Sequence, residues 1–266
     1  MSNQLMKRKI IIIKMAFLFL MVSHSLYGQN VRFVNSGTIE YEKKVNMYAK
    51  LAKRITKNNS SWMQQVYDQF KKSQPQFKTV KNILSFSKDA SLYKPVETDA
   101  VPTSNFFGND PTIDLKKTVY TDFKTNTFTS EKNIYEEVFL VQDTLRKIKW
   151  KITSETREIA GYDCRRANAL IMDSIYVVAF YTDQIPVSGG PESFTGLPGM
   201  ILGLALPHEN TTWFASKVND VPTQPSAIIP AKKAKKVNNE GLLNSLKSSI
   251  EDWGEYAQEV FKAMML

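Results

Sequence analysis

Alternation of apolar and polar residues through the middle of the chain is the feature that most restricts its fold. In segments 39–45, 84–86 and 148–152, apolar side chains mostly occupy every second position, and charged or hydroxyl side chains lie between them. A period of two with one polar face is typical of antiparallel strands that cover a core on one side. The pattern therefore predicts an antiparallel sheet as the main element of the fold.

Further segments with strand-like composition extend this predicted sheet. We expect strands at 119–123, 127–131, 135–141, 165–172, 175–181, 200–206 and 212–218. Residues 124–126 have the composition of a hairpin turn between the first two of these strands. No helical segments are interleaved with the strands, which argues against a parallel sheet.

Two amphipathic segments flank the strand-rich region. In 55–70 and in 240–264 apolar residues recur at helical spacing, which predicts one helix after the first strand and one at the C-terminal end. Each apolar stripe fits either packing against the sheet or binding to a partner, and packing is the commoner use. Gly254 weakens the second helix, because glycine is a poor helix former. The predicted class is α+β with a mainly antiparallel sheet.

The first 28 residues have the pattern of a cleavable secretory signal. An apolar run at 15–22 follows four basic residues: Lys7, Arg8, Lys9 and Lys14. A membrane anchor is the alternative, but the apolar stretch is interrupted by Lys14 and is shorter than the roughly 20 residues that span a bilayer. We therefore expect cleavage after Gly28 and an exported chain that begins near Gln29, with no transmembrane segment.

Cysteine content bears on how the exported chain is stabilised. Cys164 is the only cysteine, so no disulfide can form within the chain. Stability must therefore come from a packed core, and 29–266 is long enough to form one domain. The stretch 222–239, rich in proline and lysine, is interpreted as a surface linker to the C-terminal helix at 240–264.

Charge argues against a nucleic-acid-binding role. The net charge is +9, but four of the cations and none of the 26 acidic residues lie in the predicted signal, so 29–266 carries +5. The basic residues gather in three separate groups, at 50–57, 146–151 and 232–236. Nucleic-acid-binding proteins usually concentrate them on one face. A solvated surface with some attraction to anionic envelope components fits better.

Segment 185–206, IPVSGGPESFTGLPGMILGLAL, differs from the rest of the chain. Proline and glycine recur through its first 15 residues, and an apolar run ends it. A type II turn across 197–200 would place Gly199 at the position that requires a positive φ. The segment is therefore predicted to form a sharply shaped loop that leads into a buried strand.

The hexapeptide GLPGMI, at 196–201, resembles the motif that names the GLPGLI family of exported proteins from Gram-negative bacteria, with Met200 at a leucine position. The resemblance extends upstream to the strand near 37–41 and includes Trp150, Glu155, Ile159, Gly161, Tyr162, Cys164, Ala167, Tyr181, Ile185, Pro186, Pro191 and Phe194. It implies a location in the periplasm or cell envelope and a strand-rich fold. A curved antiparallel sheet with helices across its concave side would suit the order of elements. The resemblance implies no established reaction and no catalytic residues.

The same loop is the candidate binding site. We expect it to lie at the mouth of the sheet, where apolar side chains contact an apolar ligand or an envelope protein. The alternative is that its prolines and glycines only turn the chain. The candidate binding residues are Tyr181, Phe194, Gly196, Leu197, Pro198, Gly199 and Met200.

Catalytic and metal sites have little support in the sequence. His208 is the only histidine after residue 28, and a triad with Asp183 and Ser188 would lack the nucleophile-elbow motif. One cysteine and one histidine do not suffice for a zinc site. Copper(I) is a weaker alternative, with Cys164, Met172, Met200 and His208 as ligands. No cofactor-binding motif is found, so no cofactor is expected.

The sequence therefore favours a non-enzymatic binding or accessory protein of the envelope, with peripheral membrane contact as a further option. Two alternatives stay open. A structural or assembly factor would gain support from an exposed apolar helix face near Trp253 and Phe261. A hydrolase would gain support if Asp183, Ser188 and His208 met in one polar cleft.

Overall fold

The computed structural model describes residues 6, 33–97, 112, 117–134, 137–230 and 234–266. Contacts divide the chain into two units, Met1–Arg32 and Phe33–Leu266, and every element discussed below belongs to the second. Apart from Met6, the predicted signal at 1–28 lies outside the described residues. Within the described part, no helix combines the length and the apolar composition needed to cross a membrane.

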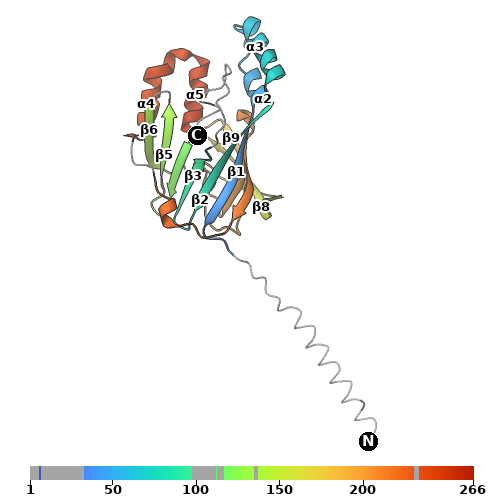
Figure 1. Ribbon diagram of the computed structural model, residues 1–266, viewed down its shortest axis with the longest axis vertical. Helices are drawn as coiled ribbons and strands as arrows, with labels where there is room; N and C mark the ends of the chain where they lie inside the picture. The colour runs from blue at the N-terminus through green and yellow to red at the C-terminus, as the bar shows by residue number, and fades with distance from the viewer. Residues whose placement is uncertain (1–5, 7–32, 98–111, 113–116, 135–136, 231–233) are drawn as a thin grey trace. The chain divides into compact units, whose positions relative to one another are not determined.

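Twelve strands in the described residues form one sheet, which confirms the predicted antiparallel architecture (Figure 1). They are β1 (Gly37–Asn46), β2 (Phe77–Phe86), β3 (Ala90–Pro95), β4 (Lys117–Asp122), β5 (Thr127–Ile134), β6 (Glu137–Thr144), β7 (Lys151–Ile159), β8 (Tyr162–Ile171), β9 (Ile175–Thr182), β10 (Met200–Leu206), β11 (Thr211–Asn219) and β12 (Lys235–Val237). Neighbours pair antiparallel, except that β12 runs parallel to β6. The order is β12-β6-β5-β4-β3-β2-β1-β11-β10-β9-β8-β7, so two meanders meet where β1 pairs with β11.

The connection from β6 to β7 shows that the sheet is strongly curved. These strands are ten positions apart in the sheet, which in a flat sheet would separate them by about 48 Å. The chain between Thr144 and Lys151 spans at most about 25 Å even when fully extended. The sheet must therefore curl until its two ends approach each other, which confirms the expected curvature and creates a concave interior.

The inner face of this curved sheet carries the main core. Along β4 buried and partly exposed residues alternate, with Lys117, Val119 and Thr121 turned inward. Strands of both meanders contribute apolar side chains to one cluster, including Tyr41, Leu84, Phe86, Tyr93, Val119, Phe128, Val177, Met200, Leu202, Leu204 and Trp213. The alternating sequence pattern is thus explained by burial on the concave side.

Two helices follow β1, where one was predicted. The first, α2 (Met47–Ala52), begins at Asn46, whose side-chain oxygen accepts a hydrogen bond from the Ala49 amide at 3.1 Å. The second, α3 (Ser60–Ser73), begins five residues later than the expected helix at 55–70. Both pack on the end of β1 through a separate small core that contains Val45, Met47, Leu51, Met63 and Phe70.

The C-terminal segment forms two helices instead of the single helix expected at 240–264. They are α4 (Asn239–Ile250) and α5 (Glu255–Met265), separated by a short 3-10 turn, η4 (Glu251–Trp253), and by Gly254. Gly254 has a φ of +61°, which a helix cannot accommodate, so the chain cannot continue as one helix through this residue, which caps the start of α5. Their inward residues, among them Leu242, Leu246, Ile250, Val260, Phe261 and Met264, pack on the main core.

Other departures from prediction concern strands and the linker: β3 and most of β2 and β7 lie outside the predicted strands. The stretch 222–239, expected to be a surface linker, contains a short 3-10 turn, η3 (Pro225–Ala227), and β12, which pairs with β6. Residues 148–150 were expected to be in a strand, but β7 begins only at Lys151. Because many more residues lie in strands than in helices, the fold is better described as mainly β than as α+β.

Candidate functional site

A cavity of about 1040 Å³ lies in the concave interior of the sheet. Its walls come from β4, β5, the end of β6, the β6–β7 connection, the β9–β10 loop and the end of α5. Apolar side chains line part of it: Val119, Phe123, Phe128, Leu145 and Ile148. Charged and hydroxyl side chains line the rest, and the buried members of that set make it the candidate site.

Two lysines face each other directly on the inner wall of this cavity. Lys117 on β4 and Lys132 on β5 are cross-strand partners in the register, and both are about 95% buried. Like charges directly opposite each other destabilise a sheet, and buried ammonium groups are costly without an anion. Burial lowers the pKa of both lysines, that of Lys132 well below its usual value. The pair therefore requires negative charge or strong hydrogen-bond acceptors nearby.

Glu192 provides negative charge for one of these lysines. Its carboxylate accepts hydrogen bonds from Lys117 Nζ at 2.7 Å and from Lys43 Nζ on β1 at 3.0 Å. Burial would raise the pKa of Glu192, but the attraction of the two ammonium groups outweighs it and lowers that pKa to about 2. Glu192 is thus an ionised, fully enclosed carboxylate that neutralises one of the two cations it contacts.

Glu192 lies in the proline- and glycine-rich loop between β9 and β10, which places its side chain beside Lys117 on the opposite wall of the interior. In the sheet order β4 lies five positions from β10, so a side chain of this loop reaches Lys117 only across the concave side. Backbone hydrogen bonds fold the loop on itself, from the Met200 amide to the Ile185 carbonyl and from the Ile201 amide to the Gly189 carbonyl. Glu192 has a φ of +54°, a left-handed conformation that the surrounding loop imposes.

The β6–β7 connection supports the same loop. Trp150 Nε1 donates a hydrogen bond of 2.9 Å to the Thr195 carbonyl of the loop. Within the loop itself, the Gly196 amide donates to Ser188 Oγ at 3.0 Å. The two segments that border the cavity on this side are therefore joined to each other. A fixed loop of this kind holds Glu192 in place at little further entropic cost.

The predicted type II turn at 197–200 is wrong in one respect. Gly199 does not have a positive φ, whereas Gly196 does, at +95°. Gly199 is required for a different reason: a Cβ atom there would lie 2.1 Å from the Thr182 carbonyl oxygen. The motif is thus constrained at Gly199 by close backbone approach to the end of β9.

The other inward lysine, Lys132, is held by the end of α5. Its Nζ donates to the Met264 carbonyl, and Arg146 Nη2 from the β6–β7 connection donates to the Met265 carbonyl at 2.6 Å. Cations at a helix C-terminus interact favourably with the helix dipole. In the described part of the chain, neither cation contacts a carboxylate side chain.

Ser130 completes the polar part of the cavity. It lies on β5 two residues before Lys132, on the same face, and is 1% exposed. Its hydroxyl has no hydrogen-bond partner among the described residues. Buried hydroxyl groups are usually paired, so an orphaned one that lines a cavity points to a group that the cavity receives.

The apolar residues of the predicted binding loop are not at a surface. Tyr181, Phe194, Leu197 and Met200 are each at most 2% exposed and belong to the main core. Gly196 is exposed and lines the cavity, and Pro198 is exposed. Contact of these residues with a ligand stays a prediction.

The residues considered for catalysis or metal binding lie apart from one another. Ser188 lines the interior cavity, His208 lines a second cavity, and Asp183 pairs with Arg165 at 2.8 Å on the surface. Cys164 is buried, and burial raises the pKa of its thiol to about 12. Among the described residues, no three His, Cys, Asp or Glu side chains are arranged to hold a metal ion.

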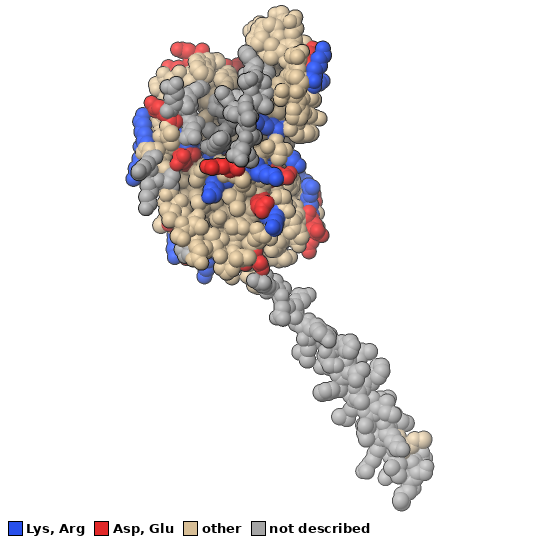
Figure 2. Space-filling model, in the orientation of Figure 1, with Lys and Arg blue, Asp and Glu red and all other residues tan. Residues whose placement is uncertain are grey.

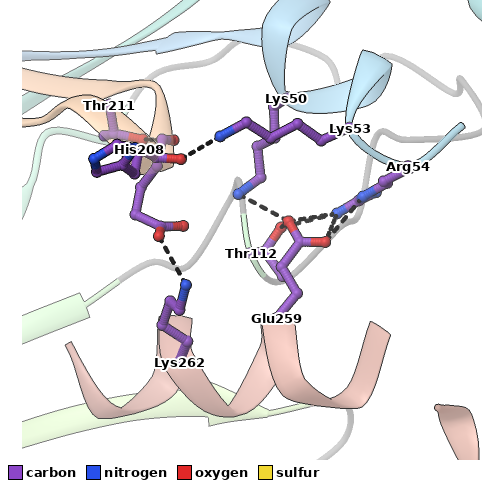
Figure 3. A network of polar contacts seen from close by, with 9 residues as sticks. Lys50, Lys53, Arg54, Thr112, His208, Thr211, Glu259 and Lys262 are labelled. Atoms are coloured by element: carbon purple, nitrogen blue, oxygen red, sulfur yellow. Dashed lines mark hydrogen bonds and ion pairs between the residues drawn. The ribbon is translucent and has the colours of Figure 1, made fainter. Parts of the chain in front are cut away.

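The second cavity, of about 620 Å³, lies between α2, α5 and the short 3-10 turn η2 (Pro207–Glu209) (Figure 3). Glu259 of α5 accepts from Lys50 and from Arg54, both at 3.0 Å, and Lys262 pairs with Glu209 at 3.0 Å. Two of the carboxylates that line this cavity, Glu209 and Glu259, are therefore already bound by neighbouring cations. We interpret this network as the contact that holds α5 against α2 and η2.

The surface of the described residues offers fewer indications of function than the interior cavity. Figure 2 shows acidic and basic side chains interspersed over the visible face, without one extended basic patch. Phe261 is buried whereas Trp253 is about half exposed, so they do not form the exposed apolar face that would favour an assembly role.

Comparisons with known proteins add little. A family model described as "Protein of unknown function (Porph_ging)" matches residues 170–203, which is consistent with the resemblance to an uncharacterised GLPGLI-type family. No curated protein matches the chain. Two solved structures of PNGF-II, in C2 and P21 space groups, are similar at 15% identity with TM-scores of 0.48 and 0.47. They align with 86% and 77% of this chain, which spans about a third of theirs, 33% and 32%.

Proposed function

We propose that this chain is an exported binding protein, without an enzymatic role, whose interior cavity holds a small molecule with a substantial apolar part. The observation that carries the proposal is the cavity itself, which lies inside the curled sheet and has an apolar wall formed by residues such as Val119, Phe128 and Ile148. Concave sites with apolar walls and a few placed polar groups are the usual form of small-molecule binding sites.

The location follows from the N-terminal pattern and from the family resemblance. A basic segment, an apolar run and Gly28 precede Gln29 in the order that signal peptidases recognise. Secreted protein should therefore have the mass calculated from Gln29. Retention of residues 1–28 in protein isolated from the envelope fraction would contradict the proposed export.

Ligand binding is tested with a neutral apolar fluorophore, N-phenyl-1-naphthylamine, and protein purified from the producing cell and then stripped of bound lipid. Saturable binding is expected, and Ile148→Glu should weaken it about tenfold or more, because a charge would enter the apolar wall. Ile152→Glu is the matched control, since Ile152 lies on β7 and is 45% exposed. Thermal unfolding verifies that both variants fold.

Native mass spectrometry of the unstripped protein gives an independent result. A stoichiometric mass excess in the range of a small organic molecule supports the proposal. A bare mass, together with no saturable fluorophore binding by the wild-type chain, would overturn it whatever the variants do.

A further inference from the structure

We infer that the polar end of the cavity, formed by Lys117, Ser130, Lys132 and Arg146, receives an oxyanion carried at one end of the ligand's apolar chain. This inference rests on the proposed function and specifies the class of ligand. The bound molecule would be an anionic amphiphile, with a carboxylate or a phosphate ester as its head group.

The first argument is the charge balance around the cavity. Lys117, Lys132 and Arg146 line its polar end, whereas Glu192 is the one carboxylate side chain that the described residues place in contact with any of them, and it is shared with Lys43 of β1. Asp143 also lines the cavity, but it accepts hydrogen bonds from the Thr144 and Asn239 amides. Glu192 is fully used by Lys43 and Lys117. An excess of buried positive charge is costly unless an anion joins it.

The second argument concerns the partners that Lys132 and Arg146 have now. Both donate to carbonyl oxygens of the last turn of α5, which are neutral acceptors. Hydrogen bonds from ammonium or guanidinium groups to an oxyanion are roughly twice as strong as those between neutral groups. An anionic head group would therefore compete effectively for these donors and displace the carbonyls of Met264 and Met265.

Ser130 provides a third and independent argument. Its hydroxyl is buried, lines the same cavity and lacks a partner among the described residues. A hydroxyl donates to an oxyanion as readily as to any acceptor. Helix capping alone explains Lys132 and Arg146, but it does not explain Ser130.

The apolar wall decides which anion fits. Phe128 lies two residues before Ser130 on the same face of β5, and Val119 is the cross-strand partner of Ser130. Both line the cavity beside the polar end. A free inorganic anion would leave this wall in contact with water, whereas an alkyl chain would cover it.

The experiment compares four probes on the lipid-stripped protein by isothermal titration calorimetry at pH 6: dodecanoate, dodecyl phosphate, 1-dodecanol and inorganic phosphate. We expect the two amphiphilic anions to bind about tenfold or more tightly than dodecanol, and phosphate alone to bind far more weakly. The ratio between dodecanoate and dodecyl phosphate identifies the preferred head group.

Variants locate the site. Lys132→Met and Ser130→Ala should each weaken dodecanoate binding, by about tenfold for the lysine and about fivefold for the serine, and leave dodecanol binding unchanged. Lys149→Met is the matched control, because Lys149 is exposed and does not line the cavity. Ser130→Ala keeps the test valid if Lys132→Met fails to fold.

The possible results distinguish a failure of the anion site from a failure of the proposed binding function. Equal affinity for dodecanoate and dodecanol would overturn the anion site but leave apolar binding intact. If phosphate binds as tightly as the amphiphiles, the inference that the ligand has an apolar chain would be wrong, and the site would be one for small anions. If none of the chain-bearing probes binds, the proposed function itself fails.

Discussion

Lys117 and Lys132 lie directly opposite each other on adjacent strands, both buried, and only Lys117 contacts a carboxylate side chain among the described residues. Glu192 is the carboxylate that neutralises Lys117, whereas Lys132 donates only to a backbone carbonyl. The stability of the fold should therefore depend strongly on this one acidic side chain.

We expect Glu192→Gln to lower the free energy of unfolding by about 3–5 kcal/mol, since it leaves Lys43 and Lys117 buried without their anion. Urea denaturation measures the change. Glu155→Gln is the control: Glu155 pairs with Arg166 at the surface, so its loss should cost less than about 1 kcal/mol.

The pH dependence gives a second readout for Glu192. Its pKa is lowered to about 2 in the folded chain, from 4.5, so the unfolded chain binds more protons between these values. Stability is therefore lost as pH falls through that window. Glu192→Gln should show a smaller loss on acidification than the wild type, and equal slopes would contradict the assignment.

The close approach at Gly199 predicts a steric penalty. In Gly199→Ala the new methyl group would overlap the Thr182 carbonyl, so we expect destabilisation at the upper end of the range of about 1–3 kcal/mol. Gly161→Ala is the matched comparison, because Gly161 has a φ of +82° and open space around it. That variant should lose only about 1–2 kcal/mol from the left-handed conformation. A loss at Gly199 no larger than the loss at Gly161 would show that the close approach to the Thr182 carbonyl does not constrain the motif.

The strands were largely predictable because their signal is local. Alternation of buried and polar residues marks a strand wherever one face is covered, and β10 was predicted at its observed bounds. Helix α2 was missed because six residues are too few to show a helical period, although Asn46 offered a capping signal. The curl of the sheet was not derivable from alternation, since it depends on β1 pairing with β11, far along the chain.

The candidate site was missed for a related reason. Two signals were available: Glu192 is the only charged residue in 185–206, and Lys117 and Lys132 share the period of the apolar residues Val119 and Phe128. Either could have indicated buried charge. The contact between Glu192 and Lys117, however, depends on the β9–β10 loop crossing the concave side of the sheet, and no local sequence pattern specifies that crossing.

Cys164 should be chemically silent in the folded chain. It is fully buried, and its thiol pKa is raised to about 12 by burial first and by the charge of Asp163 second. The thiolate is the reactive form, so iodoacetamide at pH 8 should not modify native protein. Complete modification in guanidinium chloride is the control, and rapid alkylation of the native chain would show that the β8 region opens readily.

Lys132, which contacts no carboxylate side chain among the described residues, should affect the stability of the fold at alkaline pH. Burial lowers the pKa of Lys132 well below 10.5; Lys117 and Arg146 lower it further, and Glu192 opposes them. Between the lowered pKa and 10.5 the unfolded chain binds a proton that the folded chain does not. Stability should therefore rise with pH in that window, by up to about 1.4 kcal/mol per pH unit for one group. Urea midpoints from pH 7 to 10 should climb in the wild type and in Lys149→Met, and climb less in Lys132→Met. An equal rise in all three would show that Lys132 is charged in the folded protein, with an acceptor strong enough to hold its proton.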